Sequence, residues 1–444
     1  MLKIISRVAV ITVLAALSAA AHAVAVNQMF VFGDSLSDSG NAAALTPVAP
    51  GVSFFPPSDP NLVSNVPIPL PYDYVFSNGP TAPEQLASLL GTAPSLPAWP
   101  TSPDNSNPNF AVGGAMTGAG PTVATLPPGT QGLCCNYNFL VNSPTGLQPG
   151  TNPNVPPGFP AVQFTGINNQ IDLFALRLSS GAIPAFNPST TLFSVWGGAN
   201  DIFLALALAQ ELGSDPMVNL SPADQAALIQ AYTVNAAKNI GLDIAALAGL
   251  GAENFLVPNM PDLGQTPFGL SEGGEGSPFS MELTGISMGF NAVLDATITQ
   301  LQAGGLDIIE FDTFDALHEL IDSGIFADTE HPCLDTTNSS TVEATLPNVI
   351  GGCQGYLFFD SVHPTVSTAA ILAAEMQVAV PEPNELALLA VALLASGWFG
   401  LARRRLESCA RSATFIPCCG RPFHAACRRT GNQESLRTQP WEYP

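Results

Sequence analysis

Ser35 stands at the end of a short apolar run, in a position that suits a nucleophile. The run at 29–32 is rich in residues that favour buried strands, and it breaks abruptly at Gly33-Asp34-Ser35. Open α/β sheets bind ligands at the carboxyl ends of their strands, so such a strand would place the Ser35 hydroxyl at that edge. A helix after Ser35 would add backbone amides that can hold an anion. On this segment alone, a turn capped by Asp34 and Ser35 explains the sequence equally well.

A serine nucleophile needs a base, a group that orients the base, and donors for the developing oxyanion. The chain has five histidines, and His363 is the strongest candidate for the base. It ends a D-x-x-H pattern that begins at Asp360, after an apolar run and just before a helix that starts with proline. At this spacing Asp360 can accept from one ring nitrogen while the other faces the nucleophile. The alternative for His363 is a solvated surface histidine.

The other four histidines suit this role less well. His22 lies in an N-terminal segment that we expect to be removed, and His424 lies beyond an apolar C-terminal segment. His318 falls in a helical stretch and His331 in a loop that contains a cysteine. We expect both of these side chains to be structural or exposed to solvent.

Two glycine-containing turns could supply the oxyanion donors. Gly114 lies in the block 109–115, where adjacent glycines allow a backbone N–H to point into a cleft. Asn200 follows the apolar run 191–198, so its amide would face the carboxyl edge of the same sheet. Each turn is ordinary when it is considered by itself.

Ser287 satisfies the pattern of a different hydrolase class. It lies in the segment 285–289, which matches the G-x-S-x-G motif of α/β-hydrolases. That motif requires a strand immediately before it, whereas residues 281–284 continue a helical pattern. We therefore expect Ser287 to be a helix residue.

Helical and extended patterns alternate through most of the chain. We expect helices at 83–90, 167–179, 221–250, 278–303 and 366–377, and strands at 29–32, 191–198, 254–258 and 307–311. Ser221, with Asp224 three residues later, marks the start of one of these helices. This alternation predicts a parallel sheet covered on both faces. The proline-rich segments 47–108 and 118–160 are expected to form long loops that cover or bind a substrate.

Four separate blocks of the sequence resemble the GDSL esterases and lipases, also called SGNH hydrolases. These blocks are Gly33-Asp34-Ser35-Leu36, Asn-Phe-Ala-x-Gly-Gly-Ala with Gly114, Gly-x-Asn-Asp with Asn200, and Asp360-x-x-His363. All four occur in the family's order within residues 29–377. The segments 76–80 and 257–264 further resemble the bacterial branch with secreted lipases and phospholipid-active acyltransferases.

The resemblance implies a three-layer α/β/α, flavodoxin-like fold with a parallel sheet. It implies that Ser35 is the nucleophile, His363 the base and Asp360 its orienting acid. The oxyanion hole would consist of the Ser35 and Gly114 amides together with Asn200. Ester hydrolysis through an acyl-enzyme at such a site needs no metal or organic cofactor. The same site would serve an acyltransferase or a phospholipase, and a non-catalytic surface or matrix protein is a further alternative.

The charge distribution separates the body of the chain from its C-terminal segment. The chain has 12 Lys and Arg against 35 Asp and Glu, and most of the basic residues are arginines from Arg403 onward. The body is therefore strongly acidic, which argues against nucleic acid or anionic lipid headgroups as partners. Since Ser35 and His363 lie near the two ends of this body, 24–380, and must meet at one site, we expect a single large domain.

Residues 1–23 have the organisation of a secretory signal peptide. Lys3 and Arg7 precede an apolar run at 8–20, and Ala21-His22-Ala23 matches an A-x-A cleavage site. An uncleaved anchor is the alternative, although the run is short for a spanning helix. We expect cleavage after Ala23 and export of the protein.

Residues 381–405 resemble the PEP-CTERM sorting signal of exported Gram-negative proteins. A Pro-Glu-Pro tripeptide at 381–383 precedes an apolar run at 386–402, which could form a transmembrane helix, and three arginines follow at 403–405. The resemblance implies a transient inner-membrane anchor, cutting by a sorting protease, and a periplasmic, cell-surface or extracellular location. The signal usually ends a chain, whereas here an Arg- and Cys-rich tail follows at 406–444, which we expect to be disordered. A buried C-terminal helix is the alternative for the apolar run.

The cysteines of an exported protein can pair with one another. Cys333 and Cys353 bound a polar loop and are our favoured disulfide. The adjacent Cys134 and Cys135 are poorly placed to bridge each other. The cysteines of the tail lack the CxxC spacing of a zinc site, so we do not expect a metal there.

Overall fold

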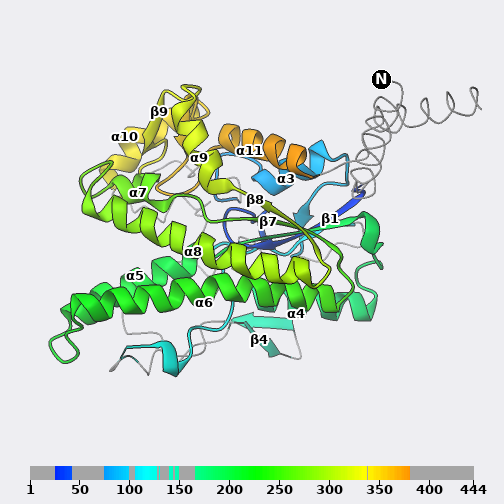
Figure 1. Ribbon diagram of the computed structural model, residues 1–444. Coiled ribbons are helices and arrows are strands. Elements are labelled where there is room, and N and C mark those ends of the chain that lie inside the picture. The colour runs from blue at the N-terminus through cyan, green and yellow to red at the C-terminus, as the bar shows by residue number, and fades with distance from the viewer. Residues whose placement is uncertain are drawn as a thin grey trace, which may run out of the picture. The chain divides into compact units, whose positions relative to one another are not determined.

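In the computed structural model, a six-stranded parallel sheet forms the centre of the fold (Figure 1). Within the described residues its strands are β1 (Gln28–Gly33), β2 (Leu96–Pro97), β3 (Pro108–Asn109), β6 (Thr191–Trp196), β7 (Asn254–Pro258) and β8 (Asp307–Phe311). The strand order is β2-β3-β1-β6-β7-β8. With the short edge strand β2 set aside, the other five follow the order 2-1-3-4-5 of flavodoxin-like sheets. The predicted α/β fold is therefore confirmed.

The structure describes residues 26–42, 75–99, 106–127, 130, 140–143, 146–149, 166–337 and 339–380. These residues belong to one unit of the chain, Ser18–Asn384. The predicted signal peptide, the C-terminal sorting signal with its apolar run, the tail, and Cys134 and Cys135 lie outside the described residues. Along the described part of the chain, no helix is long and apolar enough to cross a membrane.

Helices cover both faces of the sheet (Figure 1). One layer contains α4 (Ile167–Ser180), α5 (Ala199–Ser214), α6 (Pro222–Gly249) and α8 (Pro278–Ala303). The opposite layer contains α3 (Ala82–Leu89), α9 (Thr313–Asp322) and α11 (Val366–Ala379). Smaller elements are α7 (Pro267–Leu270), α10 (Ser339–Ile350), the strand pair β9 (Asp328–Pro332) and β10 (Tyr356–Phe358), the hairpin β4 (Leu140–Ser143) and β5 (Gly146–Pro149), and the 3₁₀ turns η1 (Val123–Thr125), η3 (Pro188–Thr190) and η4 (Leu263–Gln265).

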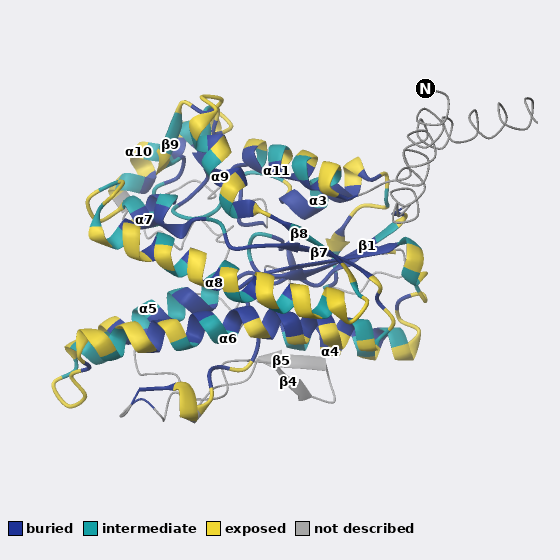
Figure 2. Cartoon of the chain, in the orientation of Figure 1, coloured by how far each residue is buried: buried dark blue, intermediate teal, exposed yellow. Residues whose placement is uncertain are grey.

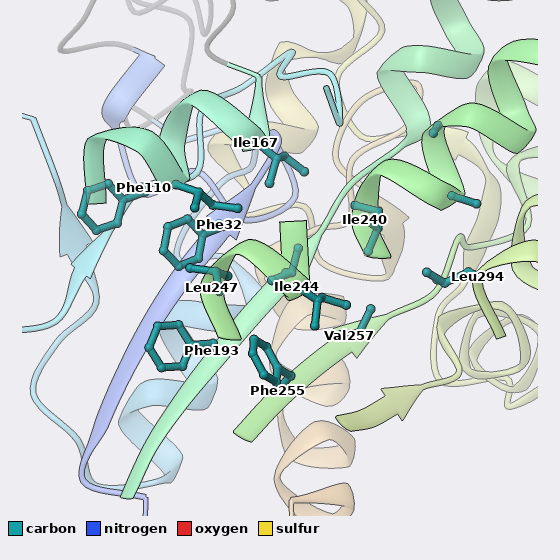
Figure 3. Packing of buried hydrophobic residues seen from close by; sticks show 14 of the residues in the cluster. Phe32, Phe110, Ile167, Phe193, Ile240, Ile244, Leu247, Phe255, Val257 and Leu294 are labelled. Atoms are coloured by element: carbon teal, nitrogen blue, oxygen red, sulfur yellow. The ribbon is translucent and has the colours of Figure 1, made fainter. Parts of the chain in front are cut away.

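Alternate residues of each central strand pack on opposite faces of the sheet. In β1, Phe30 and Phe32 join the core cluster under α4, α6 and α8, whereas Met29 and Val31 join the cluster under α3 and α11. Figure 3 shows Phe32 beside residues from the neighbouring strands and from α6. Figure 2 shows buried strands between helices whose outer sides are exposed. Burial of each such side chain contributes about 1.5–3 kcal/mol to the free energy of unfolding. This packing fixes the strand ends, which carry the residues of the site.

All nine predicted helices and strands are confirmed within two residues at each end. Helix α6 begins as predicted, because the Ser221 hydroxyl accepts a hydrogen bond from the Asp224 N–H at 3.2 Å. Helix α5, however, is absent from the sequence-based predictions, because the residues after Gly198 indicate only a turn. The strand before it also ends earlier than predicted, at Trp196, since Gly198 adopts a left-handed φ of 117° and caps α5.

Cys333 and Cys353 form the predicted disulfide, which is therefore confirmed. Both cysteines are buried in a small apolar cluster with Phe359. The Cys333 N–H donates to the Phe358 carbonyl at 3.0 Å, and the next N–H along the chain donates to the Phe359 carbonyl at 2.7 Å. The disulfide cluster thus supports the backbone immediately before Asp360.

Candidate active site

The chain turns sharply after β1, and Ser35 lies in this turn at the carboxyl edge of the sheet. Gly33 is required here, because a Cβ at this position would overlap the Trp196 carbonyl oxygen of β6. Gln170 of α4 fixes the same residue, since its Oε1 accepts from the Gly33 N–H at 2.9 Å and its Nε2 donates to the Gly33 carbonyl at 2.7 Å. The end of β1 is therefore fixed immediately before Ser35.

The structure brings Ser35, His363 and Asp360 into one hydrogen-bonded series. His363 Nε2 lies 2.7 Å from Ser35 Oγ, and His363 Nδ1 lies 2.7 Å from Asp360 Oδ2. The N–H groups of Val362 and His363 donate to Asp360 Oδ1 at 3.0 and 2.9 Å, so the carboxylate is held by its own loop. The ring of Phe76 packs against the imidazole with centroids 5.3 Å apart. Each ring nitrogen thus has the partner that the sequence predicts.

Electrostatics favour an ionised Asp360 beside a basic His363. Burial raises the pKa of Asp360, but the His363 charge and the hydrogen bonds to the carboxylate outweigh it, so the net pKa lies below its ordinary value. Burial lowers the pKa of His363, but the charge and hydrogen bond of Asp360, with a contribution from Asp34, raise it overall. The pair therefore stabilises an imidazolium, which is the species that forms when histidine accepts a proton from serine.

The oxyanion-hole candidates lie beside Ser35. Gly114 has a left-handed φ of 76°, a conformation that favours glycine. Asn200 is the second residue of α5, and its Nδ2 donates to the Ala115 carbonyl at 3.0 Å. Ser35, Gly114, Asn200 and His363 all line one pocket of about 240 Å³. The five predicted residues thus come together, with Asp360 behind His363.

Buried carboxylates position these groups. Asp38 accepts hydrogen bonds from four backbone N–H groups, those of Gly40, Asn41, Ala42 and Gly113, at 2.6–3.0 Å. It therefore ties the turn after Ser35 to the glycine pair that contains Gly114. Burial raises the pKa of Asp38 to about 6, while these N–H donors oppose that shift.

Asp34 and Asp201 make further hydrogen bonds around the pocket. Asp34 Oδ2 lies 3.5 Å from Asn200 Nδ2, and its Oδ1 accepts from the Leu36 N–H at 3.1 Å. Asp201 accepts from the N–H and hydroxyl of Thr117 at 2.9 and 3.0 Å, which fixes the segment after Gly114. Burial raises the pKa of Asp34 to about 6 and that of Asp201 to about 7.

Sequence reasoning did not identify Gln170 or Asp38. Gln170 could have been noticed as a polar residue next to Ile171 on the apolar face of its helix. Asp38 could have been noticed as a second aspartate three residues after Ser35. Both act on backbone groups of distant segments, so their partners could not be inferred from the sequence.

The pocket that contains Ser35 is lined by none of Ser287, His318 and His331. Ser287 is a buried residue of α8, as predicted, and its hydroxyl accepts from the Leu263 N–H at 3.1 Å. His318 is partly exposed and lies 3.0 Å from Asp262 Oδ2. His331 is largely exposed, as expected, but it lies in strand β9, which pairs with β10, and not in the predicted loop. No group of three or more His, Cys, Asp and Glu in the described residues is arranged to hold a metal ion.

A protein-family model, described as GDSL-like Lipase/Acylhydrolase, matches residues 29–376. The GDSL esterase/lipase APG of Arabidopsis thaliana is 30% identical over 165 residues, which cover 33% of this chain and 46% of that protein. The thermolabile hemolysin of Vibrio parahaemolyticus is 27% identical over 140 residues, which cover 29% of this chain and 32% of that protein. The chain thus spans less than half the length of these relatives. A solved structure from the lipolytic protein G-D-S-L family of Veillonella parvula shares 13% identity, covering 43% of this chain and 79% of that one, with a TM-score of 0.21.

Proposed function

The chain belongs to the GDSL-like lipase/acylhydrolase family, and from this premise we propose that it cleaves carboxylic esters through an acyl-enzyme on Ser35. The observation that carries the proposal is the hydrogen-bonded series Ser35–His363–Asp360 at the wall of a pocket. This series supplies a nucleophile, a base and an orienting acid in the order that acyl transfer requires.

The proposed reaction has two stages that use the same residues. Ser35 Oγ attacks the ester carbonyl while His363 Nε2 accepts its proton, and the oxyanion receives hydrogen bonds from the Ser35 and Gly114 amides and the Asn200 side chain. His363 then returns the proton to the leaving alcohol, and the acyl group remains on Ser35. In the second stage His363 deprotonates a water molecule, which attacks the acyl carbon. The bond from this carbon to Ser35 Oγ then breaks, His363 returns the proton to Ser35 Oγ, and the carboxylic acid is released. An alcohol in place of this water would give acyl transfer, which is the alternative within the same chemistry.

A fluorophosphonate probe tests this function, because it phosphonylates only an activated serine. We expect one label per chain, on the peptide that contains Ser35, and parallel loss of nitrophenyl butyrate hydrolysis. A folded protein that takes no label would instead favour the non-catalytic surface or matrix protein. Added short alcohols would distinguish an acyltransferase, since they would divert product from the acid to a new ester. A panel that also includes phospholipids and acetylated polysaccharide would identify the phospholipase alternative.

Replacement of Asn200 by alanine should lower kcat by about 10²–10³ with little change in KM, as is typical when one oxyanion donor is removed. The matched control is Asn235→Ala, because Asn235 also donates to a backbone carbonyl, that of Ala119, but does not line the pocket. Steady-state kinetics on nitrophenyl butyrate measure both variants. A value of kcat for Asn200→Ala within about threefold of wild type would show that this amide does not contact the oxyanion.

We also propose that this enzyme is exported as a member of the secreted bacterial branch and processed at both ends. The signal-peptide pattern at 1–23 and the PEP-CTERM-like pattern at 381–405 support this proposal. Removal of the first would release the domain 24–380, and a sorting protease would separate it from a transient membrane anchor at 386–402.

Mass spectrometry of the mature protein from its native host tests the export proposal. We expect an N-terminus at Val24 and a C-terminus close to Pro383, and a protein that ends at Val380 should retain hydrolysis. Peptides from 411–437 in the active, exported form would contradict the processing.

A further inference from the structure

A second cavity, of about 850 Å³, adjoins the pocket that contains Ser35. We call it the outer groove, and it is lined by residues of α5, α6, α7, α8, the segment after α7 and the loop at Ser361 and Val362. Figure 1 shows where the four helices lie. Phe203 and Val362 line both cavities, so they form the boundary between them. The distal part of a long substrate would cross this boundary and lie in the outer groove, while the reacting ester stays in the pocket with Ser35.

One wall of the outer groove, made of aromatic and aliphatic side chains, can contact an apolar chain, while polar side chains such as Gln210, Gln225 and Ser271 line the rest. Phe203, Phe268 and Phe279 pack edge to face in series, with ring centroids 5.4 and 5.5 Å apart, and Leu206 and Ile229 add aliphatic surface. This series is continuous with the reaction pocket, because Phe203 belongs to both cavities.

The charged residues of the outer groove disfavour an anionic ligand. Glu272 and Glu282 are its charged lining residues, and both are exposed. Since neither lysine nor arginine is among the residues that line the groove, a phosphate or carboxylate there would meet negative charge without a cationic partner. An uncharged aliphatic chain meets no such penalty.

The position of Phe203 favours the acyl side of the ester. Phe203 lies one turn after Asn200 on α5, and Asn200 is the proposed partner of the carbonyl oxygen. A carbon chain that runs from this carbonyl along α5 reaches Phe203 after one turn, and we assign that chain to the acyl group.

We propose that the outer groove binds the distal part of a long acyl chain, which enters between Phe203 and Val362. The proposal rests on the function proposed above, and it makes long-chain esters the preferred substrates. Each methylene that enters an apolar site raises kcat/KM about fourfold. Long-chain nitrophenyl esters should therefore exceed butyrate in kcat/KM for the wild-type protein.

Ala207→Trp tests the groove, because it places a large ring in the groove one turn beyond Phe203. We expect the ratio of kcat/KM for nitrophenyl dodecanoate to that for nitrophenyl butyrate to fall at least about tenfold, which corresponds to two or more displaced methylenes. Ala245→Trp is the matched control, since Ala245 is an exposed residue of α6 that lines neither cavity, and its ratio should equal that of wild type.

A second series of substrates fixes which side of the ester occupies the groove. Butyl and dodecyl acetate have the same acyl group and differ only in the alcohol, so their ratio should be the same in wild type and Ala207→Trp. A fall in this ratio, or an unchanged acyl ratio, would overturn the proposal, as would a wild-type protein that hydrolyses butyrate but not dodecanoate. A wild-type protein that hydrolyses no ester and takes no fluorophosphonate would instead contradict the proposed function.

Discussion

Ser35→Ala should reduce ester hydrolysis by about 10⁶ in kcat, since loss of a triad serine in comparable hydrolases costs about that factor. The variant lacks the only atom at this position that can bond to the acyl group, so hydrolysis would have to proceed without an acyl-enzyme. Ser35 is partly exposed, and its hydroxyl contacts His363, so the fold should be retained. Initial rates on nitrophenyl butyrate, together with circular dichroism, measure both effects.

Ser287→Ala provides the contrast for this experiment, because Ser287 is the other serine in a hydrolase-like motif. Its hydroxyl accepts from the buried Leu263 N–H, so its loss should lower the free energy of unfolding by about 1–3 kcal/mol. Activity per folded molecule should nevertheless exceed that of Ser35→Ala by several orders of magnitude. The reverse ranking of the two variants would show that the nucleophile has been assigned wrongly.

The helices and strands could be predicted where burial imposes a clear period. The strands at Thr191–Trp196 and Asn254–Pro258 are buried throughout and read as continuous apolar runs. Helix α5 gave no such signal, because it starts three residues after a strand and residues 202–208 are apolar on almost every side. Strands β2 and β3 have two residues each and contain proline, so no sequence pattern could reveal them.

The His–Asp pair shows why local spacing alone does not identify a site. The D-x-x-H pattern occurs three times. One copy, Asp315 and His318, lies in α9. In the other two the histidine Nδ1 lies against the aspartate, at 3.2 Å for His331 and Asp328 in β9 and at 2.8 Å for the same Oδ1 contact of His363 and Asp360. Only burial and the partner distinguish them, because the His331 side chain is 75% exposed and that of His363 is 12% exposed. The contact between His363 and Ser35 spans 328 residues, so it followed from the family's order of motifs and not from spacing.

The positioning residues were missed for a related physical reason. Gln170 and Asp38 form hydrogen bonds with backbone groups of Gly33 and Gly113. Because nearly every residue carries such backbone groups, the identity of the partner residue cannot be recognised from the sequence. Their importance depends on where the fold places those backbone groups. Here that place is the end of β1 and the loop before Gly114.

Asp360→Asn should lower kcat by about 10⁴ and move the acidic limb of the pH profile to lower pH. The neutral amide cannot stabilise the imidazolium of His363. Its NH₂ group can also take the place of the carboxylate oxygen that faces His363 Nδ1. In the wild type the charge of Asp360 raises the pKa of His363 above its ordinary value of about 6.5, so activity, which needs neutral His363, should rise with pH through a midpoint above that value. In the variant burial lowers this pKa without opposition from Asp360, so the midpoint should fall.

Asp328→Asn is the matched control for this prediction, because it makes the same change in the D-x-x-H pattern of β9, where the histidine also lies against the aspartate. Its carboxylate also accepts from the N–H three residues later, at 2.9 Å, but His331 lies on the surface and lines no part of the reaction pocket. We therefore expect wild-type kcat and a wild-type pH profile from Asp328→Asn. Measurement of kcat and kcat/KM between about pH 5 and 9 for the wild type and both variants separates the outcomes. If Asp360→Asn reduced kcat with no change in the pH midpoint, the Asp360 carboxylate would only hold its loop in place. If Asp328→Asn gave the larger loss of kcat, His331 and not His363 would be the base.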